Sequence, residues 1–230
     1  MFFYDPTYFI FMIPAFIIMG LASWYVRSAY NKWSQTRASS GLTGAQAASR
    51  LISTGNLYGV QVASTQGQLS DHYDPRNKTL FLSQGVYNSP SVAAVAIAAH
   101  ELGHAMQDAD NYFPMQIRSF LVPVVNIGSN LGWILIMIGL VLRVTELAWL
   151  GVLVFSGGAL FALATLPVEF NASARAKELL YSTGIIQTEE ERRGVNSVLN
   201  AAALTYVAGL ITAVLQLLYF VFLVGGRRRN

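Results

Sequence analysis

Four long apolar segments divide the chain and predict helices that cross a bilayer. They cover about residues 8–26, 119–142, 147–166 and 204–224. Each has about 20 residues, the length that an α-helix needs to span the hydrocarbon core. Within hydrocarbon a lone segment satisfies its own backbone hydrogen bonds only as a helix, so we expect four helices. Because the gap at 143–146 is short, the second and third helices are predicted to form a hairpin.

Two polar segments, 27–118 and 167–203, remain between the apolar ones. Two predicted spans separate them, so both fall on the same side of the membrane. The pattern predicts five parts, listed here in chain order: an N-terminal anchor (1–26), a membrane-proximal domain (27–118), a transmembrane hairpin (119–166), a helical segment (167–203) and a C-terminal transmembrane helix with a basic tail (204–230).

The polar segments carry local signals for helices and short strands. Thr43 is the predicted N-cap of a helix that ends before Gly55, and Ser89-Pro90 is predicted to open a helix that runs to about Gln107. A further helix is expected from about Glu169 to Tyr181, and a capping box of Thr188 and Glu191 opens one that continues into the fourth span. Three strands are expected at 60–64, 69–74 and 79–83, the last two joined by a hairpin turn at 75–78.

Composition supports a membrane protein. Hydrophobic residues make up 53% of the 230 residues and charged residues 12%, about half the charged share of a typical soluble domain. The chain has no cysteine, which excludes disulfides and metal sites built on thiolates. We therefore expect a mainly α, integral membrane protein with four transmembrane helices and a small α+β domain.

The distribution of basic residues predicts the orientation. Eleven of the 15 Lys and Arg residues lie in the two polar segments, seven in 27–118 and four in 167–203. The positive-inside rule then places these segments in the cytoplasm. Arg227, Arg228 and Arg229 argue against this orientation, because four spans put them on the opposite side. Their simplest role is to anchor the tail to lipid headgroups, and nothing in the chain indicates nucleic-acid binding.

The candidate chemistry lies in the sequence His100-Glu101-Leu102-Gly103-His104. On a helix, histidines four positions apart share one face, and both can bind zinc through neutral imidazole nitrogens. Glu101 would then lie beside the metal, where it can take a proton from a water molecule. The pattern is typical of zinc-dependent peptidases.

A catalytic zinc site needs a third protein ligand and one open position. Two candidates stand out, His72 in the first polar segment and Glu169 at the polar end of the third span. Pro167, two residues before Glu169, is a residue that would re-aim this carboxylate. The residues alone leave both candidates open.

Several stretches together resemble one known family. Asp71–Pro75, Val86-Tyr87, the zinc motif with its preceding helix, and Leu166–Phe170 are similar to the YugP-like neutral zinc metallopeptidases of bacterial membranes. The zinc motif, the membrane hairpin and the later Glu-x-x-Ala are more distantly similar to the HtpX-type membrane gluzincins. The resemblance implies a zincin-like domain in which His100, His104 and Glu169 hold zinc and Glu101 is the general base.

The chain departs from the gluzincin pattern just after Glu169. Gluzincins of this type tend to place an aspartate there to orient a zinc-binding histidine, whereas this chain has Asn171-Ala172-Ser173. Asn171 is expected to accept a weaker hydrogen bond from an imidazole N–H. His72 or Tyr73 is a candidate to stabilise the oxyanion of the reaction. Arg175 is expected to face lipid headgroups.

These observations predict a membrane-embedded zinc endopeptidase in a bacterial cell membrane, with a cytoplasmic active site. Its substrates would be membrane or membrane-proximal proteins, and an oligomer or a membrane partner stays open. One alternative is a non-catalytic membrane assembly protein that keeps zinc for its structure. Another is a transporter or channel, which the near absence of ionisable residues in the spans disfavours.

Overall fold

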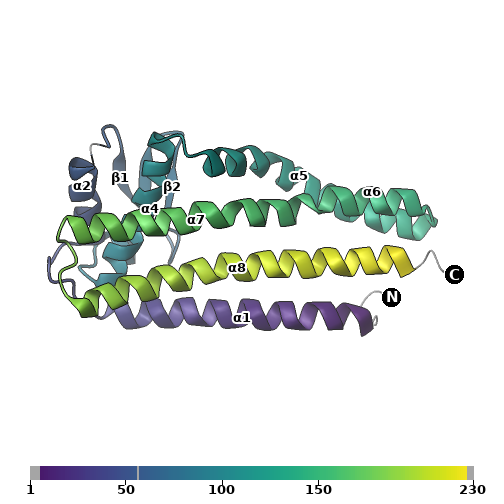
Figure 1. Cartoon of the computed structure of the whole chain (residues 1–230), viewed down its shortest axis with the longest axis horizontal. Helices are drawn as coiled ribbons and strands as arrows, with labels where there is room; N and C mark the ends of the chain where they lie inside the picture. The colour runs from purple at the N-terminus through teal and green to yellow at the C-terminus, as the bar shows by residue number, and fades with distance from the viewer. Residues whose placement is uncertain (1–5, 56, 227–230) are drawn as a thin grey trace. The chain divides into compact units, whose positions relative to one another are not determined.

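A computed structural model of the chain describes residues 6–55 and 57–226 (Figure 1). Helices predominate, and three short strands lie in the first half of the chain. The elements follow in the order α1 (Pro6–Ser34), α2 (Gly44–Thr54), β1 (Gln61–Thr65), β2 (His72–Asp74), β3 (Thr79–Ser83), α3 (Gln84–Tyr87), α4 (Val92–Ala109), α5 (Phe113–Leu142), α6 (Thr145–Phe155), α7 (Gly157–Ser182) and α8 (Glu189–Gly226).

The chain divides into two compact units. The apolar unit contains Gln116–Pro167, with the described residues up to Ala22 and those from Thr205 on. The polar unit contains Ser23–Met115 and Val168–Leu204. Each unit has a hydrophobic core of its own.

The predicted membrane helices lie largely, but not wholly, in the apolar unit. Four helical stretches are long and apolar enough to cross a membrane: Pro6–Ser34, Phe113–Leu142, Thr145–Ser182 and Glu189–Gly226. Within this unit α1 and α8 run next to each other (Figure 1), and the rings of Tyr8 and Tyr219 meet edge to face with centroids 5.3 Å apart. The expectation of four transmembrane helices with a small sheet is confirmed.

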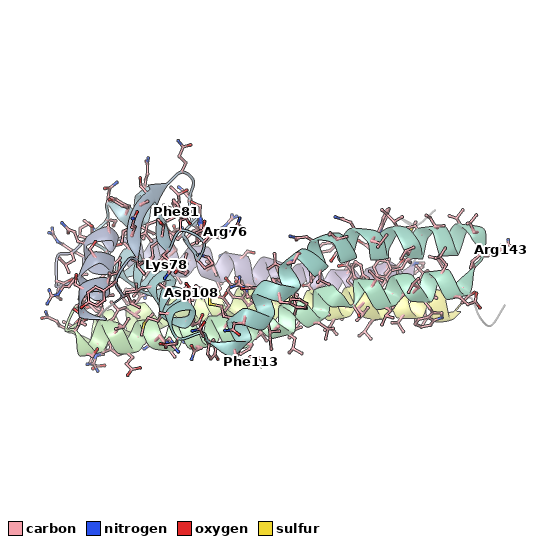
Figure 2. All side chains as sticks on the ribbon, turned by 90° about the horizontal axis from the view of Figure 1, so that it is seen from above. Arg76, Lys78, Phe81, Asp108, Phe113 and Arg143 are labelled. Carbon is pink, nitrogen blue, oxygen red and sulfur yellow. The ribbon has the colours of Figure 1, made fainter. Side chains whose placement is uncertain are left out.

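Glycines bring the two arms of the hairpin, α5 and α6, into close contact. A Cβ atom on Gly139 would lie 2.4 Å from the backbone nitrogen of Ala148, and one on Gly151 would lie 2.5 Å from that of Ile136. The turn passes through Arg143, which has a positive φ of 58° and is labelled in Figure 2. Such close backbone approach is typical of helices that associate in membranes.

The polar unit is built around α4 and a three-stranded sheet. The strand order is β1-β3-β2, with β1 parallel and β2 antiparallel to β3. The central strand is the most buried, since both Leu80 and Leu82 are fully buried. Helix α4, which carries Asp108, packs against both β2 and β3; Figure 2 labels Asp108, Phe81 on β3 and Lys78 in the turn before it.

Most local predictions in the polar unit agree with the structure. Thr43 caps α2 in a capping box with Gln46, and the helix ends before Gly55. The turn at 75–78 joins β2 and β3 as predicted. The prediction that Ser89 caps the next helix is wrong, because the N-cap of α4 is Ser91. Here the carbonyl groups of Ser89 and Pro90 accept hydrogen bonds from Gly44 and Ala38, so these two residues belong to the preceding loop.

The later helices are longer than predicted. The helix expected at 169–181 is the end of α7, which runs without a break through Pro167 from Gly157 to Ser182. The third span is instead interrupted at Ser156, where α6 ends. The backbone N–H groups of Thr188 and Glu191 each bond to the other's side chain, and α8 continues from this capping box to Gly226 as predicted. The arginines predicted as a lipid anchor, at 227–229, lie outside the described residues.

Candidate metal centre

Helix α4 supplies the first two donors of the site. Ser91 accepts a hydrogen bond from the backbone N–H of Ala94 at the start of this helix, which fixes where its turns begin. The first half of α4 is a run of buried small and branched residues, and it holds the helix inside the core of the polar unit. One turn separates His100 from His104, so their rings lie on the same face, with centroids 4.9 Å apart.

The third donor comes from α7, which packs tightly against α4. The contact depends on Gly103, where a Cβ atom would lie 2.5 Å from the carbonyl oxygen of Ala172. No side chain larger than hydrogen fits there without a shift of one helix. The close approach places Glu169, one turn before Ala172 on α7, next to the two histidines. Only 2% of the Glu169 surface is exposed.

The distances among these three side chains suit a zinc ion. The carboxylate oxygen Oε2 of Glu169 lies 3.3 Å from Nε2 of His100 and 3.6 Å from Nε2 of His104. Ligands about 2.1 Å from a tetrahedral zinc lie about 3.4 Å from one another. Among the described residues, His100, His104 and Glu169 form a buried group whose donor atoms all lie within 4.8 Å of one another. Nitrogen and carboxylate donors are also the chemistry that zinc accepts in catalytic sites.

Each imidazole has a separate partner for its other ring nitrogen. The ring nitrogen Nδ1 of His104 lies 3.0 Å from Oε1 of Gln107, and Nδ1 of His100 lies 3.2 Å from Oγ of Ser173. When Nδ1 donates its proton to such an oxygen, Nε2 keeps a free lone pair for a metal. Both rings are thus held with Nε2 towards Glu169.

Sequence reasoning missed Gln107 and Ser173. Both were detectable from helical spacing, since Gln107 follows His104 by three positions and Ser173 follows Glu169 by four. The expectation that Asn171 accepts a hydrogen bond from an imidazole is wrong, because its Oδ1 accepts from Nε2 of Gln107 and from Nε of Arg175.

Arg175 also differs from its prediction. We expected Arg175 to face lipid headgroups, whereas its guanidinium donates both to Asn171 and to a carboxylate oxygen of Asp110. Its side chain is 20% exposed. Its position is explained by helical spacing, since it lies one turn after Asn171 on α7.

Glu101 is a buried neighbour of this group. Burial acts to lower the pKa of His104, but the hydrogen bond to Glu169 and the charges of Glu101 and Glu169 outweigh it, so the pKa lies above its usual value. Glu101 thus lies close enough to His104 to interact with it electrostatically.

The structure does not bring His72 into the group of three donors. His72 lies at the start of β2, an edge strand, where its Nδ1 is 2.9 Å from the carbonyl oxygen of Ser70 and its ring stacks on Phe81. The next residue, Tyr73, points to the opposite face, and its hydroxyl donates a 2.8 Å hydrogen bond to Asp108, one turn after His104 on α4. Of these two candidates for oxyanion stabilisation, Tyr73 is the one bonded to the helix that carries the histidines.

Comparison with known proteins places these features in a family. Residues 8–225 match the family model described as "Putative neutral zinc metallopeptidase". The chain is 43% identical over 225 residues to the "Putative membrane protease YugP" of Bacillus subtilis (strain 168), a match that covers 96% of this chain and all of that protein. No solved structure matches the chain.

Proposed function

This chain belongs to the neutral zinc metallopeptidase family, and we propose that it is an integral-membrane endopeptidase with its active site at His100, Glu101, His104 and Glu169. The observation that carries the proposal is the buried pair of histidines facing a buried carboxylate, with a second carboxylate directly beside them. Two imidazole Nε2 atoms that face the same carboxylate oxygen can bind one cation together with it, and their spacing fits zinc.

In the proposed mechanism His100, His104 and Glu169 would hold the metal as a gluzincin-type ligand set. A bound zinc ion would polarise the peptide carbonyl and lower the pKa of a water molecule. Ser173 and Gln107 keep the two imidazole rings in the orientation that this requires.

Glu101 carries the proton transfers. Its carboxylate takes a proton from the attacking water as the carbon–oxygen bond forms, and passes it to the amide nitrogen as the carbon–nitrogen bond breaks. The products are a carboxylic acid and an amine, so one water molecule is consumed for each peptide bond. A hydrogen-bond donor from β2, His72 or Tyr73, would stabilise the negative oxygen of the intermediate.

The edge strand β2 suggests how a substrate is held. Its pairing with β3 leaves its other side without a strand partner in the described sheet, so an extended peptide would add to the sheet as a further strand. The hydrogen bond from the hydroxyl of Tyr73 to Asp108 connects this strand to α4. A peptide bound at the strand would therefore lie near the metal ligands. Four apolar helices in the same chain make membrane or membrane-proximal proteins the natural substrates.

We also propose a location in the bacterial cell membrane with the polar unit in the cytoplasm. The support is the concentration of Lys and Arg in the polar segments. Labelling of a single cysteine introduced at Arg76 in intact cells tests this orientation, because the native chain has no cysteine. A membrane-impermeant maleimide that reacts there before lysis would contradict a cytoplasmic polar unit.

The decisive experiment compares the wild type with Glu101→Gln. The amide cannot accept the proton of the water, so we expect peptide hydrolysis to fall about 100- to 10,000-fold, while bound zinc measured by elemental analysis stays equal. Membrane proteomics of cells that carry either form would reveal substrates as proteins that accumulate in the variant. Equal protein levels and equal hydrolysis with zinc retained would contradict a peptidase and favour a non-catalytic zinc-binding assembly protein.

A further inference from the structure

Gln107 is the most deeply buried polar side chain near the metal ligands, with 0% of its surface exposed. Its amide makes three hydrogen bonds. The oxygen Oε1 faces Nδ1 of His104 at 3.0 Å, and the nitrogen Nε2 donates to the carbonyl oxygen of Val168 at 2.8 Å and to Oδ1 of Asn171 at 3.0 Å. Gln107 therefore joins α4 to α7 as well as contacting a metal ligand.

The orientation of this amide follows from its neighbours. A backbone carbonyl only accepts hydrogen bonds, so Val168 requires the NH₂ end of Gln107 on its side. Arg175 only donates, so it requires the oxygen of Asn171 towards itself, and this oxygen in turn faces the NH₂ group of Gln107. Both constraints agree, and they leave the oxygen of Gln107 for His104.

The same logic fixes the proton on His104. An amide oxygen cannot donate, so the hydrogen bond to Gln107 exists only when Nδ1 of His104 carries the proton. In the neutral imidazole Nε2 then keeps its lone pair, which a metal ion between it and Glu169 would accept. Arg175 lies at the surface end of this series of hydrogen bonds and sets its donor-to-acceptor direction. An ion pair with Asp110 holds Arg175 in place.

We propose that Gln107 is the positioning residue that selects the tautomer and ring orientation of His104, with its direction set by Val168, Asn171 and Arg175. This inference rests on the metal site proposed above and extends it to the residues that hydrogen-bond to His104. The acceptor for His104 comes from α4 itself, three residues after the histidine.

The test measures zinc affinity of the full-length protein in detergent, by competition with a chelator, for three variants. Gln107→Met keeps the volume and removes the acceptor, and we expect zinc to bind about 10- to 100-fold more weakly. Gln107→Glu adds a stronger acceptor but cannot donate to Val168, so we expect weaker binding here as well. Arg175→Met is remote from the metal and partly exposed, and we expect a loss in the same direction, below about tenfold.

Two further measurements separate positioning from general damage. Gln61→Met, at an exposed position of β1, is the matched control and should bind zinc like the wild type. Cobalt in place of zinc reports the ligand geometry through its visible absorption, and we expect shifted bands in Gln107→Met. A purely structural role would lower thermal stability and leave these bands unchanged.

The outcomes distinguish this inference from the proposed function. Wild-type affinity and spectra in both Gln107→Met and Arg175→Met would overturn the role of Gln107 and leave the peptidase proposal intact. Tighter zinc binding by Gln107→Glu would overturn the role of Val168 and Arg175 in setting direction. A wild-type protein that binds no zinc would overturn both proposals.

Discussion

Each of the two units contains a close contact between two helices at a glycine, but the two contacts have different surroundings. In the polar unit, Gly103 lets α4 approach the backbone of α7 at Ala172. In the apolar unit, Gly139 lets α5 approach the backbone of α6 at Ala148. Both contacts are too close for a methyl group, and both are formed between helices that the chain pattern predicts. The difference lies in what surrounds them.

Buried polar side chains are concentrated around the first contact. All but one of the buried polar or charged residues described belong to the polar unit, the exception being Thr165. Within one turn of Gly103 lie two histidines and a glutamate, whereas the hairpin contact is surrounded by apolar side chains. A close helix contact at a glycine therefore brings potential metal ligands together only where such residues lie within one turn of the glycine. The following substitutions test this difference, in order of decreasing expected effect.

Gly103→Ala should have the largest effect. The added methyl group would lie 2.5 Å from the carbonyl oxygen of Ala172, so α4 and α7 must separate and Glu169 must leave the histidines. We expect loss of bound zinc and a decrease in the free energy of unfolding of about 1–3 kcal/mol, measured by elemental analysis and thermal unfolding. Gly209→Ala is the control, because a Cβ atom added at this helical position would meet no atom within 4 Å beyond its own stretch of helix. Full zinc content in Gly103→Ala would show that the contact does not position the ligands.

Glu169→Gln removes one donor and leaves the helix contact in place. We expect zinc affinity to fall more than the roughly 10- to 100-fold that is typical of an orienting residue, while the helices stay packed. Chelator competition measures the affinity. Glu178→Gln changes an exposed glutamate of the same helix and should leave it unchanged. If Glu169→Gln bound zinc as the wild type does, another donor such as His72 would have to be the third ligand.

Gly139→Ala breaks the contact in the apolar unit. Its methyl group would lie 2.4 Å from the backbone nitrogen of Ala148, and we expect the protein to lose about 1–3 kcal/mol of stability in detergent. Tryptophan fluorescence can follow the unfolding, since Trp133 and Trp149 lie on the two arms of the hairpin. Zinc affinity should not change, in contrast to Gly103→Ala. Gly20→Ala, with free space around it, is the matched control, and a loss of zinc in Gly139→Ala would refute the contrast between the units.

Tyr73→Phe tests a polar contact of the polar unit that involves no metal ligand. Loss of the hydrogen bond to Asp108 should cost about 0.5–1.5 kcal/mol near neutral pH. Burial, together with the bond to Asp108, raises the pKa of Tyr73 above its usual value. Above about pH 10 the unfolded chain therefore loses this proton while the folded chain keeps it, so this stabilisation is progressively lost as the pH rises. The wild type should thus approach Tyr73→Phe in thermal stability at alkaline pH, and a constant difference between them would contradict this pKa shift.

The sequence was informative where a pattern is local. Apolar length predicted the four membrane helices, and capping residues predicted the starts of α2 and α8. The prediction failed at Ser89 because a cap depends on which neighbouring segment uses the carbonyls of the loop. The sequence also predicted separate helices before and after Pro167. That prediction failed because a helix in a packed bundle can continue through a proline.

The sequence predicted the candidate metal donors, but not all of the residues that hydrogen-bond to them. The spacing of His100 and His104 indicates a metal-binding pair. The resemblance to a family predicted Glu169 as the third ligand. The contact of Ser173 with His100 depends on how α4 lies against α7, and no pattern in either helix gives that crossing. The contact of Gln107 with His104 lies within α4 and was visible in the helical spacing.

The separation of the donors along the chain has a consequence for synthesis. His100 precedes Glu169 by 69 residues, and both arms of the membrane hairpin lie between them. At about 5–20 residues per second, the ribosome needs roughly 3–14 s to pass from the first donor to the last. A nascent chain therefore has a histidine pair without its carboxylate until the hairpin has been made, so the order of synthesis itself delays the appearance of a complete site.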